Sequence, residues 1–128
     1  MITIDTSVLI ELEAGNLDVY EKLKEIRKNH TENPALPFPC FSEFYYGILR
    51  SKGNIEASLE FLNKFTPLHS TQNSAKLFAE IKIDLEKKGK LIKTFDMIIA
   101  ALSIDHGTTL VTLDRDFENI KDLNFILL

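Results

Sequence analysis

Short apolar runs alternate along this chain with longer stretches whose apolar residues recur at helical spacing. The short runs predict strands at residues 2–4, 35–38, 108–112 and 124–128, and residues 66–69 form a further short extended piece. The run at residues 35–38 is bounded by prolines, which fit poorly inside a sheet, so an irregular loop is the alternative there. We therefore expect four to five short strands.

The stretches between the strands predict helices of different lengths. They cover residues 8–14, 17–27, 43–50, 55–65, 72–88 and 95–105. Ser42 is the expected cap of the third helix, and Ser70 or Thr71 that of the fifth. The last helix is apolar nearly all round and should be buried. Helices that alternate with short strands predict an α/β fold of three layers, α/β/α, with a central, mainly parallel sheet.

The length and composition of the chain indicate a single globular domain, residues 1–128. Apolar residues make up 45% and charged residues 27%, which is ordinary for a globular protein. The single cysteine, Cys40, rules out an internal disulfide and is expected to be a small core residue. The longest uncharged apolar stretch, residues 97–102, is too short to span a bilayer, so we expect no membrane contact and a cytoplasmic location.

Acidic residues occur where several predicted elements begin or end. Asp5 follows the first strand, Glu43 lies in the first turn of the third helix, Asp96 begins the buried helix, and Asp114 and Asp116 follow the strand after it. Parallel strands end at one edge of a sheet, so these carboxylates are expected to meet there. Taken singly, each acid could instead serve as a helix cap, a favourable charge at a helix N-terminus or a turn residue.

A cluster of carboxylates predicts a divalent metal. Carboxylates in a poor dielectric repel one another, and a cation with a preference for oxygen ligands, such as Mg²⁺ or Mn²⁺, removes that cost. No histidine and cysteine spacing suggests zinc. The net charge of −4 lacks the basic footprint of most nucleic-acid binders, but carboxylates gathered around a metal also produce an acidic total. A metal held by acids at an open cleft is typical of phosphoryl chemistry.

Four short motifs occur in order along the chain and carry a family resemblance. They are Asp5-Thr-Ser-Val-Leu-Ile, Ser42-Glu43-Phe-Tyr-Tyr-Gly, Asp96-Met-Ile-Ile-Ala-Ala and Leu110-Val-Thr-Leu-Asp114-Arg-Asp116-Phe. Together they resemble the PIN-domain proteins and, more narrowly, the VapC-type toxins of type II toxin–antitoxin pairs. The resemblance spans the whole chain, and the chain length fits it.

The resemblance implies an Mg²⁺- or Mn²⁺-dependent endoribonuclease toxin that hydrolyses RNA phosphodiesters with metal-activated water. It implies one or two metal ions held by Asp5, Glu43, Asp96 and Asp114, with Asp116 in the same site; between the last two acids, Asp114 is the favoured direct ligand. Hydroxyl residues that support the acids would be Thr6, Ser7 and Thr112. Thr6 and Ser7 are also candidate caps for the first helix.

Partners follow from the same resemblance. It implies an RNA substrate, a cognate antitoxin bound along the groove of residues 8–68, and a homodimer. Candidates for RNA contact are Arg115, Arg50 and Lys93, whereas the lysines among residues 82–93 alternate with acids and are favoured as a solvated face. Aromatic residues that look exposed and suit a partner are Tyr20, Phe44, Tyr45, Phe61 and Phe65. Tyr45 and Tyr46 could stack on bases or belong to the core.

Other functions remain to be weighed against the nuclease. A noncatalytic PIN-like module that only binds RNA or protein is the main alternative, and the presence of all the expected acids disfavours it. A phosphoacceptor receiver domain would need an acidic pair after the first strand, where Asp5 has no acidic neighbour. A HAD-type phosphatase would need an aspartate at the position of Ser7. We therefore expect the nuclease.

Overall fold

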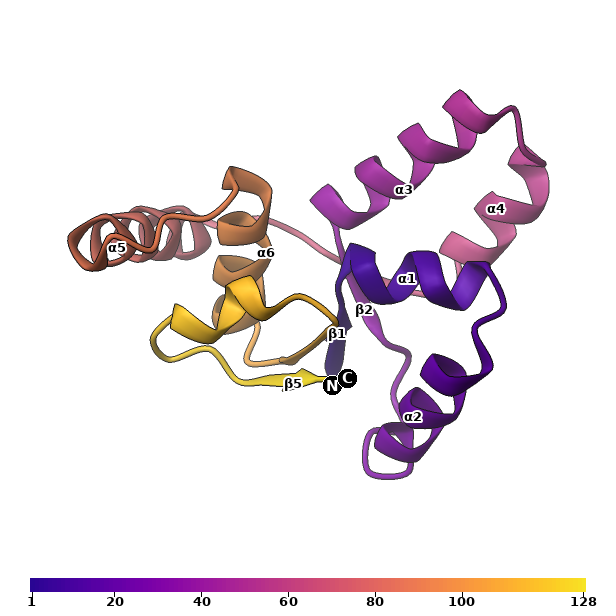
Figure 1. Ribbon diagram of the computed structural model, residues 1–128, viewed down its shortest axis with the longest axis horizontal. Coiled ribbons are helices and arrows are strands. Elements are labelled where there is room, and N and C mark those ends of the chain that lie inside the picture. Colours follow the sequence, from indigo (N-terminus) through magenta and orange to yellow (C-terminus); the bar gives the residue numbers. More distant parts are fainter.

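A single sheet of five parallel strands forms the centre of the computed structural model, which describes all residues from 1 to 128 (Figure 1). The strands are β1 (Ile2–Ile4), β2 (Ala35–Pro37), β3 (Thr66–Leu68), β4 (Thr109–Thr112) and β5 (Phe125–Leu127). Their order in the sheet is β3-β2-β1-β4-β5, and every neighbouring pair is parallel. All five predicted extended segments are therefore strands of one sheet.

Helices cover both faces of this sheet. They are α1 (Thr6–Glu13), α2 (Leu17–Arg27), α3 (Phe38–Ser51), α4 (Ile55–Leu62), α5 (Gln72–Lys88) and α6 (Thr94–Asp105), followed by the short 3₁₀ helix η1 (Arg115–Asn119). Figure 1 shows α1 to α4 on one side of the strands and α5 with α6 on the other. The predicted three-layer α/β/α fold is confirmed. No helix combines the length and the apolar character that crossing a membrane requires.

The core lies around the two central strands and α6. Ile2 and Ile4 of β1 and Leu110 and Val111 of β4 are all fully buried. Both strands are buried along almost their whole length because helices cover them from two sides. On α6, a run of residues from Met97 to Ser103 is buried except for one partly exposed position, which confirms the buried helix expected from its composition.

The start of α3 differs from the prediction. β2 ends at Pro37, as the strand interpretation required, but the helix begins at once with Phe38 and carries Pro39 in its first turn. A proline there is favourable because its fixed φ suits the helix and its missing N–H would have no intrahelical partner. The prediction that Ser42 caps this helix is therefore wrong, and Glu43 lies in its second turn rather than its first.

The caps of the other helices are partly as predicted. Thr71 caps α5, because its hydroxyl accepts a hydrogen bond from the Ser74 N–H while the Ser74 hydroxyl accepts one from the Thr71 N–H. Asp5 occupies the cap position of α1, but no side chain caps this helix. The prediction that Thr6 or Ser7 caps α1 is wrong, and their hydroxyls bind site acids instead.

Candidate functional site

The parallel register of β1 and β4 sets the position of the candidate site. Ile4 pairs with Val111, so the chain segments that leave these two strands start side by side at the carboxyl edge of the sheet. Asp5 adds one more backbone hydrogen bond between these two segments, since its N–H donates to the Val111 carbonyl at 3.1 Å. Asp114 follows β4 on the neighbouring segment. Two of the predicted acids are thus brought together by strand pairing alone.

Asp5 is buried, with 4% of its surface exposed, and its carboxylate is held by two hydroxyls. Ser7 Oγ and Thr112 Oγ1 each donate to Asp5 Oδ2 at 2.8 Å. Ser7 Oγ in turn accepts a hydrogen bond from the Leu113 N–H at 3.1 Å, which ties β4's exit to the start of α1. Hydrogen bonds of this kind offset the cost of burying a polar group. The structure thus places Ser7 and Thr112 beside this acid, as the sequence predicted.

Glu43 reaches the same region from α3. Its side chain is exposed, and Thr6 Oγ1 donates to Glu43 Oε1 at 3.1 Å. Cys40 lies one helical turn earlier, fully buried, as expected for a small core residue. Burial raises the pKa of the Cys40 thiol well above its ordinary value, and the charges of Asp5 and Glu43 add to this effect. The thiol therefore stays protonated and has no nucleophilic character.

The late acids form the tightest group with Asp96. One carboxylate oxygen from each of Asp96, Asp114 and Asp116 can be chosen so that all three lie within 4.8 Å of one another. Asp114 Oδ1 also accepts the Asp116 N–H at 2.9 Å and so fixes the turn that leads into η1. Asp5 and Glu43 lie outside this group. The geometry places both Asp114 and Asp116 in one group with Asp96, so either acid could bind a metal with it.

The pKa of Asp96 shows the influence of the other predicted site acids. Burial is the largest of the causes that together raise it from 3.8 to about 6, and the charges of Asp5, Asp114 and Glu43 contribute in that order of importance, while Lys93 opposes them. The carboxylates that follow β1 and β4 and the one on α3 therefore lie close enough to Asp96 on α6 for their charges to affect it. All the donors are oxygens and the field is negative, which fits a divalent cation such as Mg²⁺ or Mn²⁺.

Cationic residues flank the acids unequally. Lys93 precedes α6 and lies close enough to affect Asp96. The Arg115 side chain is 77% exposed, and its guanidinium pairs with Glu118 at 2.8 Å. Arg50 is exposed on α3 and takes part in none of the six ion pairs in the structure. Lys88 pairs with an acid one turn earlier on α5, as expected for a solvated face.

The aromatic residues expected on the surface are mostly part of the α3–α4 hairpin interior. Phe44 is only 5% exposed and packs on Phe61 at 5.8 Å between ring centroids, and Phe61 packs on Phe65 at 5.4 Å. The prediction that Phe44 is exposed is wrong, and of the five only Tyr20 is well exposed, at 52%. The exposed apolar residues of this hairpin are instead Phe38, Phe41, Tyr46, Leu49 and Ile55. The side chains that pack against these residues could not be predicted from the spacing of residues within one helix.

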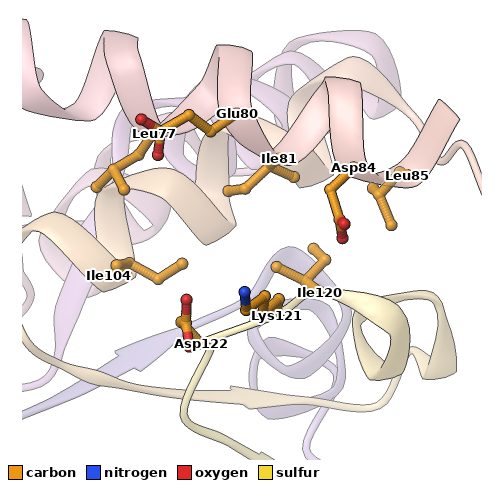
Figure 2. Close-up of a pocket in the computed structure, with 9 residues that line it drawn as sticks. All are labelled: Leu77, Glu80, Ile81, Asp84, Leu85, Ile104, Ile120, Lys121 and Asp122. Atoms are coloured by element: carbon orange, nitrogen blue, oxygen red, sulfur yellow. The ribbon is translucent and has the colours of Figure 1, made fainter. Parts of the chain in front are cut away.

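A pocket between α5, α6 and the segment after η1 is separate from the predicted site acids. Figure 2 shows this pocket, of about 250 Å³, with the side chains of α5 above it and those of residues 120–122 below. Its walls are apolar, with acids at the rim, and none of the predicted site residues lines it. The candidate site is therefore the open acidic edge of the sheet.

Comparison with known proteins identifies the class of this protein. A model of the PIN domain family matches residues 2–123, so the chain belongs to the PIN domain family. Within that family it is 31% identical over 130 residues to Ribonuclease VapC1 of Rickettsia felis, a match that covers 96% of this chain and 92% of that protein. It is also 37% identical over 83 residues to Ribonuclease VapC2 of Haemophilus influenzae, covering 62% of this chain and 63% of that one. The predicted resemblance to VapC-type PIN-domain proteins is confirmed.

Solved structures share the fold over nearly the whole chain. The structure of VapBC2 from Rickettsia felis bound to a DNA fragment from its promoter matches with a TM-score of 0.84 and 24% identity, covering 100% of this chain and 99% of that one. VapBC-1 from nontypeable Haemophilus influenzae matches with a TM-score of 0.81 and 22% identity, covering 99% and 98%. These matches confirm the order of layers and strands around the acidic edge.

Proposed function

We propose that this protein is a divalent-metal-dependent endoribonuclease and the toxin of a toxin–antitoxin pair. The observation that carries the proposal is the convergence of Asp5, Glu43, Asp96 and Asp114 on one edge of the sheet, where burial and the charges of the other three acids together raise the pKa of Asp96 to about 6. Family membership and similarity to two proteins named as VapC ribonucleases support it. A noncatalytic PIN-like module would have no need to hold repelling carboxylates together.

The residues that would hold Mg²⁺ or Mn²⁺ are the acids of this edge. We assign the metal to Asp5, Glu43, Asp96 and Asp114, with Asp116 available in the same group as Asp96 and Asp114. A bound divalent cation would supply positive charge to polarise a phosphate and to lower the pKa of water, whether one ion or two are present. Because Asp114 also caps η1, its second carboxylate oxygen is the one left to bind a ligand.

The chain's own residues orient the acids and attract the substrate. Ser7 and Thr112 fix the Asp5 carboxylate from two sides, and Thr6 restrains the otherwise mobile end of Glu43. These hydroxyls limit the rotamers that the acids can adopt, and a site held in its productive geometry loses little entropy on binding. Lys93 and Arg115 are positioned to attract a phosphate backbone to an edge that would otherwise repel it.

The partners in this proposal are an RNA, an antitoxin and a second copy of the chain. The two structures described above are named as complexes of VapB and VapC, which supports an antitoxin partner. A groove of about 440 Å³ beside α3, α4 and the edge strand β3 offers an apolar surface for a protein partner. Its wall includes Phe38, which is 49% exposed. A cytoplasmic location follows from the proposed role.

Cleavage assays with matched variants test the proposal. Purified wild-type protein should cleave single-stranded RNA with Mg²⁺ or Mn²⁺ and lose that activity in a chelator. Asp96→Asn should lose cleavage by at least about 100-fold while keeping its circular dichroism spectrum. Asp18→Asn is the control, because Asp18 is an exposed aspartate of α2 paired with Lys22. Equal, metal-dependent cleavage by the Asp96 and Asp18 variants would exclude the proposed site.

A further inference from the structure

The exposed stripe of α3 that begins at Glu43 carries two further residues suited to RNA. Tyr46 is 62% exposed, and Arg50 is exposed without an ion pair. Residues three, four and seven positions apart lie on one face of a helix, so Glu43, Tyr46, Gly47 and Arg50 form one stripe. At 1.5 Å per residue, the stripe rises about 4.5 Å from Glu43 to Tyr46 and about 10.5 Å to Arg50.

A neighbouring stripe of the same helix packs against the core, while Tyr46 and Arg50 stay exposed. Cys40 and Phe44 are 0% and 5% exposed, and Ile48 packs against the same core cluster. Tyr45 belongs to that packed side as well, since it is half-buried and its ring lies 6.1 Å from that of Phe41. The two adjacent tyrosines therefore differ: Tyr45 is a packing residue, whereas Tyr46 presents its ring to solvent.

The surface next to Gly47 is open. Apart from the two chain neighbours of Gly47 and the backbone of its own helix, no atom lies within 4 Å of the position that a Cβ would take there. No side chain from elsewhere in the protein therefore covers the helix at this point. Figure 1 shows α3 running outward from the sheet, so the stripe leads away from the acids.

We infer that this stripe, defined by Tyr46, Gly47 and Arg50, binds the single-stranded RNA on one side of the cleaved phosphate. This inference rests on the proposed nuclease function. The Tyr46 ring stacks on a base, and the Arg50 guanidinium contacts a phosphate one turn further along. An aromatic ring beside an unpaired cation is the combination that single-stranded nucleic acid requires, because every base offers a π-face and every nucleotide a negative charge. An acidic or apolar protein segment would leave Arg50 or Tyr46 without a matched partner.

The stripe would give base preference without hydrogen-bond readout. Stacking tolerates any base but is strongest for purines, so Tyr46 would impose a preference for a purine at one position near the cut. Arg50 would add affinity that depends on salt and not on sequence. Base preference and salt dependence therefore measure the contributions of Tyr46 and Arg50 separately.

The test measures RNA binding in a protein that cannot cleave. In the Asp96→Asn background with Mg²⁺, fluorescence anisotropy of a labelled single-stranded RNA of about 12 nucleotides reports Kd. We expect Tyr46→Ala to weaken binding roughly 10- to 100-fold and Tyr46→Phe to bind like the parent, since phenylalanine keeps the stacking ring. Tyr20→Ala is the control, because Tyr20 is 52% exposed on α2. A structural role for Tyr46 would not give this pattern.

Salt dependence tests Arg50 separately. Arg50→Ala should reduce the slope of log Kd against log salt concentration by about 0.7, the value for one phosphate contact on a single strand, and Arg50→Lys should restore it. Binding by Tyr46→Ala equal to that of the parent would overturn the inference, as would an equal loss in Tyr46→Phe. Such a result would assign the exposed ring to a protein partner.

The wild-type background separates this inference from the proposed function. If wild-type protein cleaves RNA and Tyr46→Ala has an unchanged KM, the nuclease stands and the RNA stripe is wrong. If wild-type protein shows no metal-dependent cleavage, the proposed function fails first. We expect Tyr46→Ala to raise KM with a smaller change in kcat, because the ring contributes to binding rather than to the chemical step.

Discussion

Replacing Asp96 by asparagine should stabilise the metal-free protein while it removes activity. The carboxylate lies half-buried beside three other acids, and its pKa rises from 3.8 to about 6. An acid whose native pKa exceeds its unfolded pKa binds a proton more tightly in the folded state. The free energy of unfolding therefore falls as pH rises from about 4 to about 6, and the cost of ionising Asp96 is complete above that window.

The size of this effect follows from the two pKa values. At about 1.4 kcal/mol per pH unit, the difference between 3.8 and about 6 corresponds to an upper bound of about 3 kcal/mol. Asp96 keeps part of its surface in water, which screens the charges, so we expect about 1–2 kcal/mol. Asparagine has nearly the same shape and no charge. Asp96→Asn should thus be more stable than wild type near neutral pH, and the advantage should vanish near pH 4.

Urea unfolding followed by circular dichroism measures this difference in a chelating buffer at several pH values. Asp18→Asn serves as the control for removing an exposed carboxylate and should change the free energy of unfolding by less than about 0.5 kcal/mol. An Asp96→Asn protein less stable than wild type near pH 7 would refute the reasoning. So would a stability gain of the same size near pH 4, because it could not come from the charge of Asp96.

Three further changes probe the site and its surroundings. Mg²⁺ should stabilise wild-type protein by about 2.7 kcal/mol at a hundred times its Kd and stabilise Asp96→Asn much less, as a thermal shift assay would register. Ser7→Ala removes a hydroxyl bonded to Asp5 and should cost about 1–3 kcal/mol in urea unfolding, together with most of the cleavage. Hydrogen bonds from Thr71 and Asn73 lower the pKa of Asp105, so its stabilising effect is present above its unfolded pKa and is lost as pH falls through the lower folded value. Thr71→Val should flatten that acid-side loss in a pH series of unfolding midpoints.

The sheet could be predicted from the sequence because its strands are short, apolar and separated by helices. Continuous runs such as those of β1 and β4 have few other stable environments than a sheet covered on both faces. Once those strands are parallel neighbours, an acid that follows one must lie near an acid that follows the other. The meeting of Asp5 and Asp114 was therefore predictable from topology. Their exact distance to Asp96 was not, because the angle of α6 depends on packing across the whole domain.

The start of α3 could not be predicted from local rules, because two of them compete. Ser42 before an apolar run is a typical N-cap, and a segment with three prolines is typical of extended chain. In the structure the second proline, Pro37, ends β2, and Pro39 fits the first turn of the helix. The burial of Phe44 in the core could not be predicted from local rules either. Its partner Phe61 belongs to another helix, and no spacing within α3 reveals it.

The candidate site contains two kinds of acid, and the difference between them supports the proposal that a cation binds there. Asp5 is buried but receives two hydroxyl hydrogen bonds, so the protein itself satisfies one of its carboxylate oxygens. Asp96 receives no hydrogen bond from any side chain. The negative charges of Asp5, Asp114 and Glu43 disfavour its charged form, and only the positive charge of Lys93 opposes them. A fold selected only for stability would lose Asp96 before Asp5, since a neutral residue there relieves the repulsion. Retaining a carboxylate at this position makes physical sense when a ligand with at least two positive charges occupies the site.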